Sequence, residues 1–441
     1  MPENTNQATT LDEWFDGAPY QGYAYSYPHK TSYRAFDPPL SLADVWADED
    51  RSALFLYAHV PFCFQRCAFC NLFTTAQGGR EREEAYLAAL VRQAEVVRDL
   101  LPDAQFSVGA VGGGTPTWLE PSALDRLFDV LEHTMGAPLG QMPLSVECSP
   151  ETVTPEKADI LARRGTTRAS IGIQSFIDGE ARGVGRTQRG MTVQTALQAL
   201  RDARIPTLNL DLIYGLRNQT AASWQVSLES ALEWRPEEIY LYPLYIRPLT
   251  GLGRRDRRWD DQRLQLYRQG RDFLRMVGYE QVSMRMFRAP WAPDERSDYR
   301  CQADGMVGLG PGARSYTRDV HYSTRFAVGP SAVLDELDSW LSKSDAQHGE
   351  VHWGTRVGTE EQRRRHVLQG LLQTEGLDRA WYRERFGADV LDHLPQLADL
   401  PELDCSDRLV LSDEGVAWSD AIAPWLYSDA VTARMAAWEQ R

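Results

Sequence analysis

Between about residue 52 and residue 277 the chain alternates short apolar runs with longer amphipathic stretches, and this alternation limits the folds open to it. Strand-like runs rich in β-branched and aromatic residues span 53–60, 106–111, 144–148, 169–176, 207–216 and 238–246. The stretches between them repeat apolar residues every three or four positions, which is the helical period. Strands separated by helices pair in parallel through crossover connections. Six such units predict an α/β fold, a partial (β/α)6 TIM-like barrel, although an open doubly wound sheet gives the same pattern.

The flanks of this region predict three further parts of the chain. We expect an N-terminal arm over 1–50, the barrel over 51–290, an extension over 291–359 and a small helical, winged-helix-like domain over 360–441. Helix starts are indicated at Thr154-Pro155, Thr192, Ser223 and Asp260-Asp261. The arm carries four tyrosines within eight residues, Tyr20, Tyr23, Tyr25 and Tyr27, which could cover the barrel mouth as a lid or pack as a structural strap.

Charge and hydropathy exclude some classes of protein. The chain has 47 basic and 62 acidic residues and a net charge of −15, which disfavours a nucleic-acid partner. The best candidate basic patch is Arg254, Arg255, Arg257 and Arg258, for which a solvated loop is the simpler interpretation. No apolar run reaches membrane-spanning length and the acidic N-terminus lacks a secretory signal. We expect a cytoplasmic monomer that binds no membrane.

Three of the six cysteines, Cys63, Cys67 and Cys70, lie within eight residues directly after the first predicted strand, at the mouth of the barrel. This C-x3-C-x2-C spacing is roughly a one-in-a-thousand chance event. Three thiolates leave one iron of a [4Fe–4S] cubane open, and an open iron can chelate the amino and carboxylate groups of S-adenosylmethionine. An electron can then enter the S–C5′ bond and release a 5′-deoxyadenosyl radical. We therefore predict a cluster that cleaves S-adenosylmethionine reductively.

The main alternative to a cluster is a zinc site completed by His59 or Cys148. Zinc loops usually pair two C-x2-C knuckles or add a His-x3–5-His pair, and neither pairing is present. The scattered Cys148, Cys301 and Cys405 do not suggest a disulfide framework. Each is more simply a small buried apolar side chain.

Polar residues follow the later strands at the same end of the predicted barrel. Gly112-Gly113-Gly114-Thr115-Pro116 comes directly after the second strand, where glycines let the backbone approach a ligand. Glu147, Gln174, Arg186 and Asp211 lie in or near strands that should be apolar. An internal salt bridge, with Arg186 as the counter-ion, is the alternative to ligand binding.

In chain order, LYAHVPFC-x3-C-x-FC, GGGTPT, SVEC, GIQSF, GRTQ and DLIYGL resemble the radical S-adenosylmethionine enzymes of the oxygen-independent coproporphyrinogen III oxidase (HemN-like) family. The resemblance covers residues 53–320 well and 360–420 more loosely. It implies that the cleaved S-adenosylmethionine contacts Tyr57, Gly113, Gly114, Thr115, Glu147, Gln174, Arg186 and Asp211. It also implies that Phe69 packs on the adenine with Tyr245 nearby, and that a reductant such as flavodoxin or ferredoxin supplies the electron. Glu147, Arg186 and Tyr57 are the candidate catalytic residues of this set.

The chain departs from two branches of that family. The porphyrinogen decarboxylases carry a further cysteine two residues after the third cluster ligand, where this chain has Leu72. The haem chaperones carry a His-Asn motif before their Gly-rich segment, whereas residues 297–305 contain no histidine.

The Gly-rich segment 306–316 is similar to one that helps to hold a second S-adenosylmethionine in the class C methyltransferases of the family. That similarity implies cofactor contacts from Gly310, Gly312, Ala313 and Arg314, although a tight turn without a ligand is the alternative. His321 is a candidate acid or base, or a packed histidine. We expect radical methyl or methylene transfer to an sp2 carbon of a small molecule, using two S-adenosylmethionines. Porphyrinogen decarboxylation and haem delivery are the alternatives.

Overall fold

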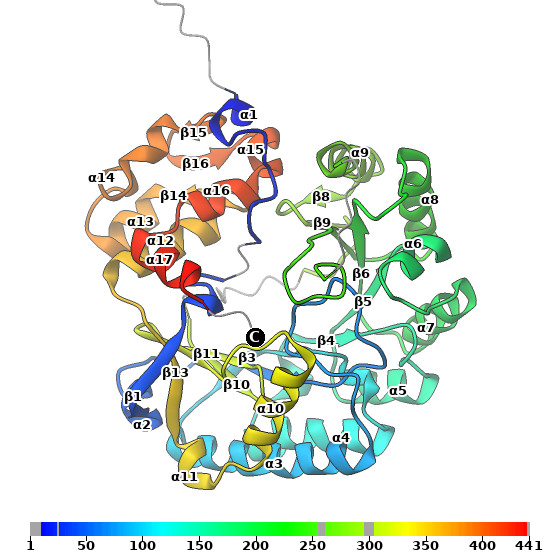
Figure 1. Cartoon of the computed structure of the whole chain (residues 1–441), viewed down its shortest axis with the longest axis vertical. Coiled ribbons are helices and arrows are strands. Elements are labelled where there is room, and N and C mark those ends of the chain that lie inside the picture. Colours follow the sequence, from blue (N-terminus) through cyan, green and yellow to red (C-terminus); the bar gives the residue numbers. More distant parts are fainter. Residues whose placement is uncertain (1–9, 24–25, 255–260, 295–303, 439–441) are drawn as a thin grey trace, which may run out of the picture.

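The computed structural model describes residues 10–23, 26–254, 261–294 and 304–438. Its main sheet has 13 strands within these residues, in the order β1-β13-β12-β11-β10-β2-β3-β4-β5-β6-β7-β9-β8. The strands curve around a central space, and the helices of the first half of the chain lie outside them (Figure 1).

The middle of the sheet consists of parallel strands in chain order. They are β2 (Leu54–Val60), β3 (Phe106–Gly113), β4 (Leu144–Cys148), β5 (Arg168–Gln174), β6 (Thr207–Tyr214) and β7 (Glu238–Pro243). The covering helices are α3 (Arg80–Leu100), α4 (Pro121–Asp129), α5 (Pro155–Arg163), α6 (Asp178–Gly183), α7 (Gly190–Asp202), α8 (Ala221–Leu232) and α9 (Arg263–Met276). The predicted partial barrel of six β/α units is confirmed.

Alternation along the parallel strands determines which side chains face inward. Leu56, Val146 and Leu210 are fully buried beneath the helices. The residues next to them in sequence, among them Tyr57, Glu147 and Asp211, face the concave side, because successive side chains of a strand point to opposite faces. The inner face therefore carries polar groups that a fully packed barrel would not tolerate.

Both edges of the parallel sheet are extended. On the β2 side, β10 (Met306–Leu309) pairs in parallel, with Gly308 opposite Tyr57. Antiparallel β11 (Arg314–Tyr316), β12 (Val320–Ser323), β13 (Glu350–Arg356) and β1 (Arg34–Ser41) follow, and β9 (Met286–Arg288) and β8 (Glu280–Gln281) extend the other edge. The helices of this region are η1 (Lys30–Ser32), α2 (Leu42–Trp46), α10 (Pro330–Leu341) and α11 (Asp345–His348).

The C-terminal part of the chain forms a small helical domain with its own sheet. Its helices are α12 (Thr359–Leu371), α13 (Arg379–Phe386), α14 (Val390–His393), α15 (Asp413–Ala417), α16 (Ser419–Trp425) and α17 (Asp429–Ala436). Its strands are β14 (Leu377–Asp378), β15 (Leu403–Cys405) and β16 (Arg408–Leu411), in the order β14-β16-β15. The β15–β16 hairpin is the predicted wing.

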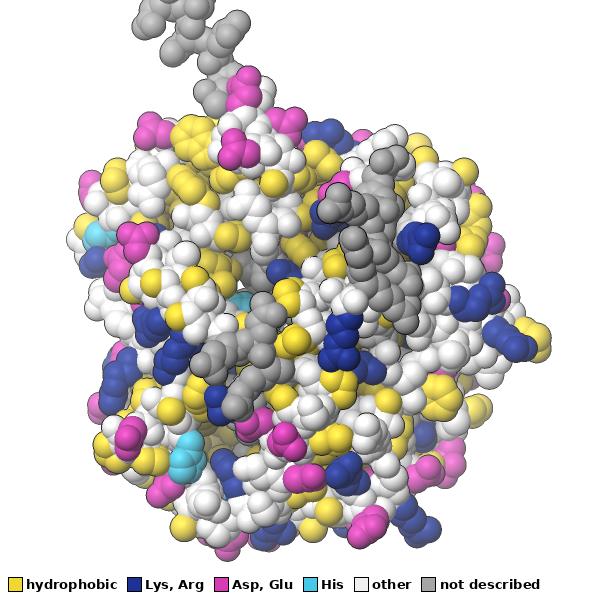
Figure 2. Space-filling view, viewed as in Figure 1, with side chains coloured by type: hydrophobic (Ala, Val, Ile, Leu, Met, Phe, Trp, Pro, Cys, Tyr) yellow, Lys and Arg dark blue, Asp and Glu magenta, His cyan; other side chains and the backbone are white. Residues whose placement is uncertain are grey.

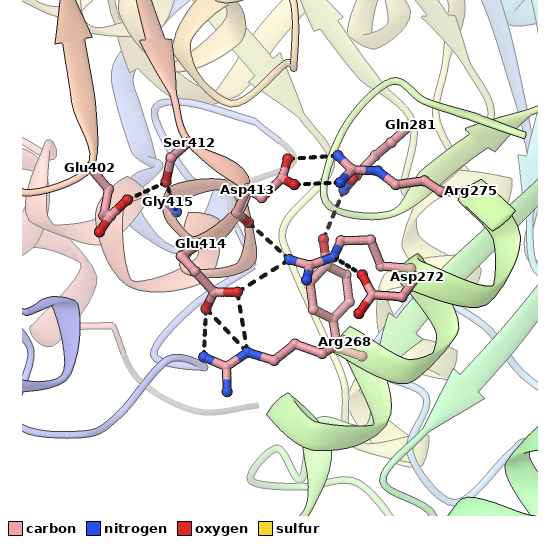
Figure 3. A network of polar contacts seen from close by, with 11 residues as sticks. Arg268, Asp272, Arg275, Gln281, Glu402, Ser412, Asp413, Glu414 and Gly415 are labelled. Carbon is pink, nitrogen blue, oxygen red and sulfur yellow. Dashed lines mark hydrogen bonds and ion pairs between the residues drawn. The ribbon is translucent and has the colours of Figure 1, made fainter.

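Ion pairs fasten this domain to the barrel through α9 and α15 (Figure 3). Arg275 and Asp413 form a two-bonded pair at 2.6 and 2.8 Å. Arg271 reaches both the Asp413 carbonyl and the Glu414 carboxylate, each at 3.3 Å. These contacts lie where α9 of the barrel meets α15 of the C-terminal domain.

The N-terminal arm contacts the C-terminal domain. Phe15, which follows α1 (Leu11–Trp14), stacks on Trp418 with ring centroids 6.0 Å apart. The buried Tyr27 hydroxyl donates to Glu361 and accepts from the backbone N–H of Ser428. These contacts fit a strap, and the arm also lines the cavity described below.

Among the described helices, none combines the length and the hydropathy that a membrane span requires.

Candidate active site

A cavity of about 910 Å³ opens at the carboxyl ends of the parallel strands. Barrel strands, the cysteine loop, the N-terminal arm and the C-terminal helix α17 all contribute to its lining. Small-molecule pockets span about 300 to 1,000 Å³, so this cavity is large enough for more than one small ligand. It lies where parallel-sheet proteins build their sites.

Cys63, Cys67 and Cys70 line this cavity from the loop that follows β2. Burial raises the pKa of Cys63 to about 12, and the neighbouring Cys70 raises it further. Burial also raises the pKa of Cys67. The Thr115 hydroxyl donates to the Cys63 sulfur at 3.6 Å, and the Thr74 hydroxyl lies 3.9 Å from the Cys70 sulfur.

The three thiols have the ligand type and number that leave one iron of a [4Fe–4S] cubane open. Among the described residues, no three histidine, cysteine or acidic side chains come close enough to share one ion. A cubane places each thiolate on a different iron and so requires a wider spacing. His59, the zinc alternative, lies in the cavity wall with its Nε2 2.9 Å from the Phe73 carbonyl. Cys148 also lines the cavity, and burial raises its pKa to about 12.

The glycine segment at the carboxyl end of β3 meets Glu147 of β4. Gly113 adopts a φ of +107°, and a Cβ there would lie 2.5 Å from the His59 ring, so the position requires glycine. Its N–H donates to Glu147 Oε2 at 2.9 Å. The Glu147 carboxyl opens to the cavity, and its pKa is raised to about 7 by the surrounding protein, with Asp211 adding to the shift. Gly114 and Thr115 line the same wall.

Asp211 approaches the cavity from β6, and Arg186 approaches it from the connection between α6 and α7. Burial raises the pKa of Asp211 to about 6, although Asn209 donates to it at 2.8 Å. Arg186 lies 3.9 Å from Glu151, and its Nε has no partner among the described residues. No described lysine or arginine forms an ion pair with Glu147 or Asp211, so the internal salt bridge considered from the sequence is not formed.

The remaining predicted cofactor contacts also lie in the cavity wall. Gln174 lines it with a φ of +68°, and Tyr57 places its hydroxyl 3.3 Å from His59 Nδ1. Phe69 lines the wall and packs against the small cluster of Val184 and its neighbours. The Tyr245 hydroxyl donates to Asp420 of the C-terminal domain at 2.5 Å.

The Gly-rich extension reaches the cavity only in part. Gly312 and Arg314 line it, whereas Gly310 and Ala313 are buried beside it. A Cβ at Gly310 would lie 2.5 Å from the His59 carbonyl, so this glycine lets β10 pack against β2.

His321, for which the sequence left open an acid or base and a packed histidine, lies in the interior of the protein. Its side chain is 0% exposed, lies outside the cavity lining and holds Nε2 2.5 Å from Arg365 Nη1. Burial and the adjacent arginine hold its pKa well below the usual range. The other interpretation, a packed histidine, agrees with the structure.

Several lining residues carry no sequence motif, and the extension and the C-terminal end contribute most of them. They are Arg247, Arg325, Phe326, Tyr427, Met435 and Trp438. Contacts between residues so far apart in sequence leave no local signal. Tyr25, Arg255, Arg257, Arg258, Asp260, Cys301 and most of the stretch 297–305 lie outside the described residues.

The family model of the radical SAM superfamily matches residues 57–231, which include the three cysteines and the strand ends β2 to β6. With the partial barrel and the cysteine cavity, this match establishes the class. Residues 57–231 are a radical S-adenosylmethionine domain.

Within that class, similarity extends over most of the chain to two kinds of protein. The chain is 26% identical over 432 residues to the anaerobic coproporphyrinogen III oxidase 1 of Cereibacter sphaeroides, covering 90% of this chain and 92% of that protein. It is 26% identical over 358 residues to the haem chaperone HemW of Bacillus subtilis, covering 78% and 90%. The fold matches coproporphyrinogen III oxidase (HemN) of Escherichia coli with a TM-score of 0.76 at 22% identity, covering 92% and 96%. The resemblance to the HemN-like family inferred from the sequence motifs is confirmed.

Proposed function

We propose that this protein is an enzyme that cleaves S-adenosylmethionine reductively and directs the resulting radical at a small organic molecule in the same cavity. The observation that carries the proposal is the convergence of Cys63, Cys67, Cys70 and the Gly113–Glu147 pair on one cavity. When bound to the three thiolates, a [4Fe–4S] cluster supplies the electron for this cleavage. A reductant of the flavodoxin or ferredoxin class would reload it.

The chain's own residues bind and orient the cofactor. The backbone of Gly113 and Gly114 offers polar groups to its amino-acid end, and the Glu147 carboxylate offers a negative charge to its cationic groups. In this proposal Asp211 and Gln174 bind its hydroxyl groups and Phe69 packs on its ring, and all three line the cavity. Tyrosines that surround the cavity limit the access of water to it.

We further propose class C methyl or methylene transfer that uses a second S-adenosylmethionine. Three observations support this finer proposal. The cavity is large, Gly312 of the Gly-rich extension lines it, and Leu72 occupies the place of the extra cysteine of the decarboxylases.

Methyl-deuterated S-adenosylmethionine tests this proposal, once turnover with a methylatable substrate is established. If the methyl transfer is correct, deuterium should appear in 5′-deoxyadenosine, because the radical takes hydrogen from the methyl group of the second cofactor. S-adenosylhomocysteine should accumulate as the second product. Mass spectrometry of the two nucleoside products measures both. Deuterium-free 5′-deoxyadenosine during turnover would instead mean that hydrogen is taken from the substrate.

Porphyrinogen decarboxylation is the second candidate, and the similarity to coproporphyrinogen III oxidases over nine-tenths of the chain favours it. Incubation with coproporphyrinogen III under reducing conditions should then release carbon dioxide without S-adenosylhomocysteine. Haem titration separates both enzymes from a chaperone, since stoichiometric binding with a Soret shift would favour the chaperone.

Replacing Glu147 by glutamine should weaken S-adenosylmethionine binding about tenfold, because a hydrogen bond to a charged group contributes about 1.5 to 3 kcal/mol. Glu147 has a pKa of about 7, so wild-type affinity should fall as the pH drops through neutrality and the carboxyl gains a proton. The glutamine variant should lose that part of the pH dependence. Isothermal calorimetry on reconstituted protein without reductant measures both.

The matched control for Glu147→Gln is Glu84→Gln, since Glu84 is an exposed residue that pairs with Arg126 on the outer helices. It should leave affinity and its pH dependence unchanged. Equal affinities for the wild type and Glu147→Gln at every pH would remove Glu147 from the cofactor site.

A further inference from the structure

The cavity wall is richer in positive than in negative charge, in a chain whose net charge is −15. Six basic side chains line it: Lys30, Arg66, Arg186, Arg247, Arg314 and Arg325. Three acidic side chains line it: Glu147, Glu151 and Asp211. Two of these acids lie on the barrel strands and the third faces Arg186, so the excess positive charge lies toward the arm and the extension. Figure 2 shows basic side chains around the hollow on this face.

Three of the basic residues line the cavity from distant parts of the chain, with Arg247 over the Tyr245 ring and Arg314 donating to Ser26 Oγ. Lys30 comes from the arm, Arg247 from the loop after β7 and Arg314 from β11. All three lower the pKa of His29 after the larger effect of burial, so they lie within electrostatic range of one imidazole. Their combined field favours an anion.

An aromatic wall adjoins this group of cations. Phe326 and Trp438 stack with centroids 5.3 Å apart and planes 30° apart, and both line the cavity. Lys30 Nζ lies 3.7 Å from the centroid of the Phe326 ring, so the cation and the wall are in direct contact. Met435 and Tyr427 complete this apolar end from the C-terminal domain.

This end of the cavity differs from the cofactor end. The cofactor residues lie on the cysteine loop and on the barrel strands, whereas the aromatic wall comes from the extension and from the C-terminal end of the chain. A flat ring suits a stacked aromatic wall, and an acid group suits three cations.

We infer that this end of the cavity binds the substrate, and that the substrate is an organic acid with a flat aromatic ring. Its acid group lies among Lys30, Arg247 and Arg314, and its ring lies against Phe326 and Trp438. The inference rests on the proposed function in one respect, that the bound acid is the molecule on which the radical acts.

Calorimetric titration with 2-naphthoate and its neutral isostere 2-naphthamide tests the inference. The reconstituted full chain is first saturated with S-adenosylhomocysteine, so that the cofactor sites are filled. The acid should bind at least about tenfold more tightly than the amide, because its charge meets the three cations. In Lys30→Met this preference should collapse toward equality. Arg247→Met should do the same, which keeps the test decisive if Lys30→Met fails to fold.

The matched control is Arg254→Met, an exposed arginine outside the cavity lining, which should retain the full preference. Trp438→Leu should weaken the acid and the amide by the same factor, since both lose the ring contact. Equal binding of acid and amide to the wild type, or no binding of either at millimolar concentration, would overturn the inference. The inference would also be overturned if naphthoate bound the reconstituted chain alone but not the chain saturated with S-adenosylhomocysteine. This end of the cavity would then hold a second cofactor. These binding results do not depend on radical formation, so they are separate from a failure of the proposed function.

Discussion

Replacing Cys63, Cys67 and Cys70 together by alanine should abolish both iron–sulfur loading and the formation of 5′-deoxyadenosine. In the proposed function these three cysteines hold the cluster, so without them no iron would be held beside the Gly113–Glu147 wall. Anaerobically reconstituted wild type should bind about four iron and about four sulfide. Iron and sulfide analysis and product chromatography with a strong reductant measure the two effects.

A cysteine outside the cavity provides the control for this loss. Cys405 lies in β15 of the C-terminal domain, so Cys405→Ala should keep the full cluster content and the full yield of 5′-deoxyadenosine. A triple variant that still produced 5′-deoxyadenosine would refute both the cluster assignment and the proposed function.

Replacing Asp420 by asparagine should destabilise the fold by about 3 to 5 kcal/mol, the usual cost of leaving one partner of a buried ion pair unpaired. Asp420 is 1% exposed and accepts a hydrogen bond from Arg285, which is 8% exposed and remains charged after the change. The Tyr245 hydroxyl also donates to Asp420. The free energy of unfolding of the cluster-free chain, measured by urea titration, should report the loss.

Asp413→Asn is the matched control, because Asp413 pairs with Arg275 on the surface, where the two side chains are 60% and 32% exposed. Exposed pairs contribute less than about 1 kcal/mol, so this variant should lose little. Similar losses in the two variants would show that burial does not set the strength of the Asp420 pair.

The barrel could be predicted because its strands are short, apolar and regularly separated by helical patterns. Each of the six predicted runs overlaps one parallel strand, and the polar residues at their ends do meet in one cavity. Helix starts were less certain. Thr154 caps α5, whereas α8 begins after Thr220, whose hydroxyl accepts from the Ser223 N–H. Ser223, the predicted start, therefore lies in the first turn of α8. The sequence could not separate the two positions, because Thr220 and Ser223 both offer a hydroxyl that can cap a helix.

The far end of the cavity could not be predicted from the sequence. Asp420 meets Tyr245, and Trp438 meets Phe326, through contacts that join distant parts of the chain. Local pattern carries no information about such pairs. The contact between Arg365 of α12 and His321 is of the same kind, because it also joins distant parts of the chain.

The strand order also dictates a sequence of events during synthesis. The β2 to β7 strands follow one another along the chain, so each can pair with its predecessor soon after it leaves the ribosome. The first strand to emerge, β1, has to wait for β13, whose Gly354 pairs with Arg34. Such distant pairings form late, because long loops must close first. The cysteine loop is therefore complete well before the arm and the C-terminal helix enclose it, which leaves an interval in which iron can enter an open barrel.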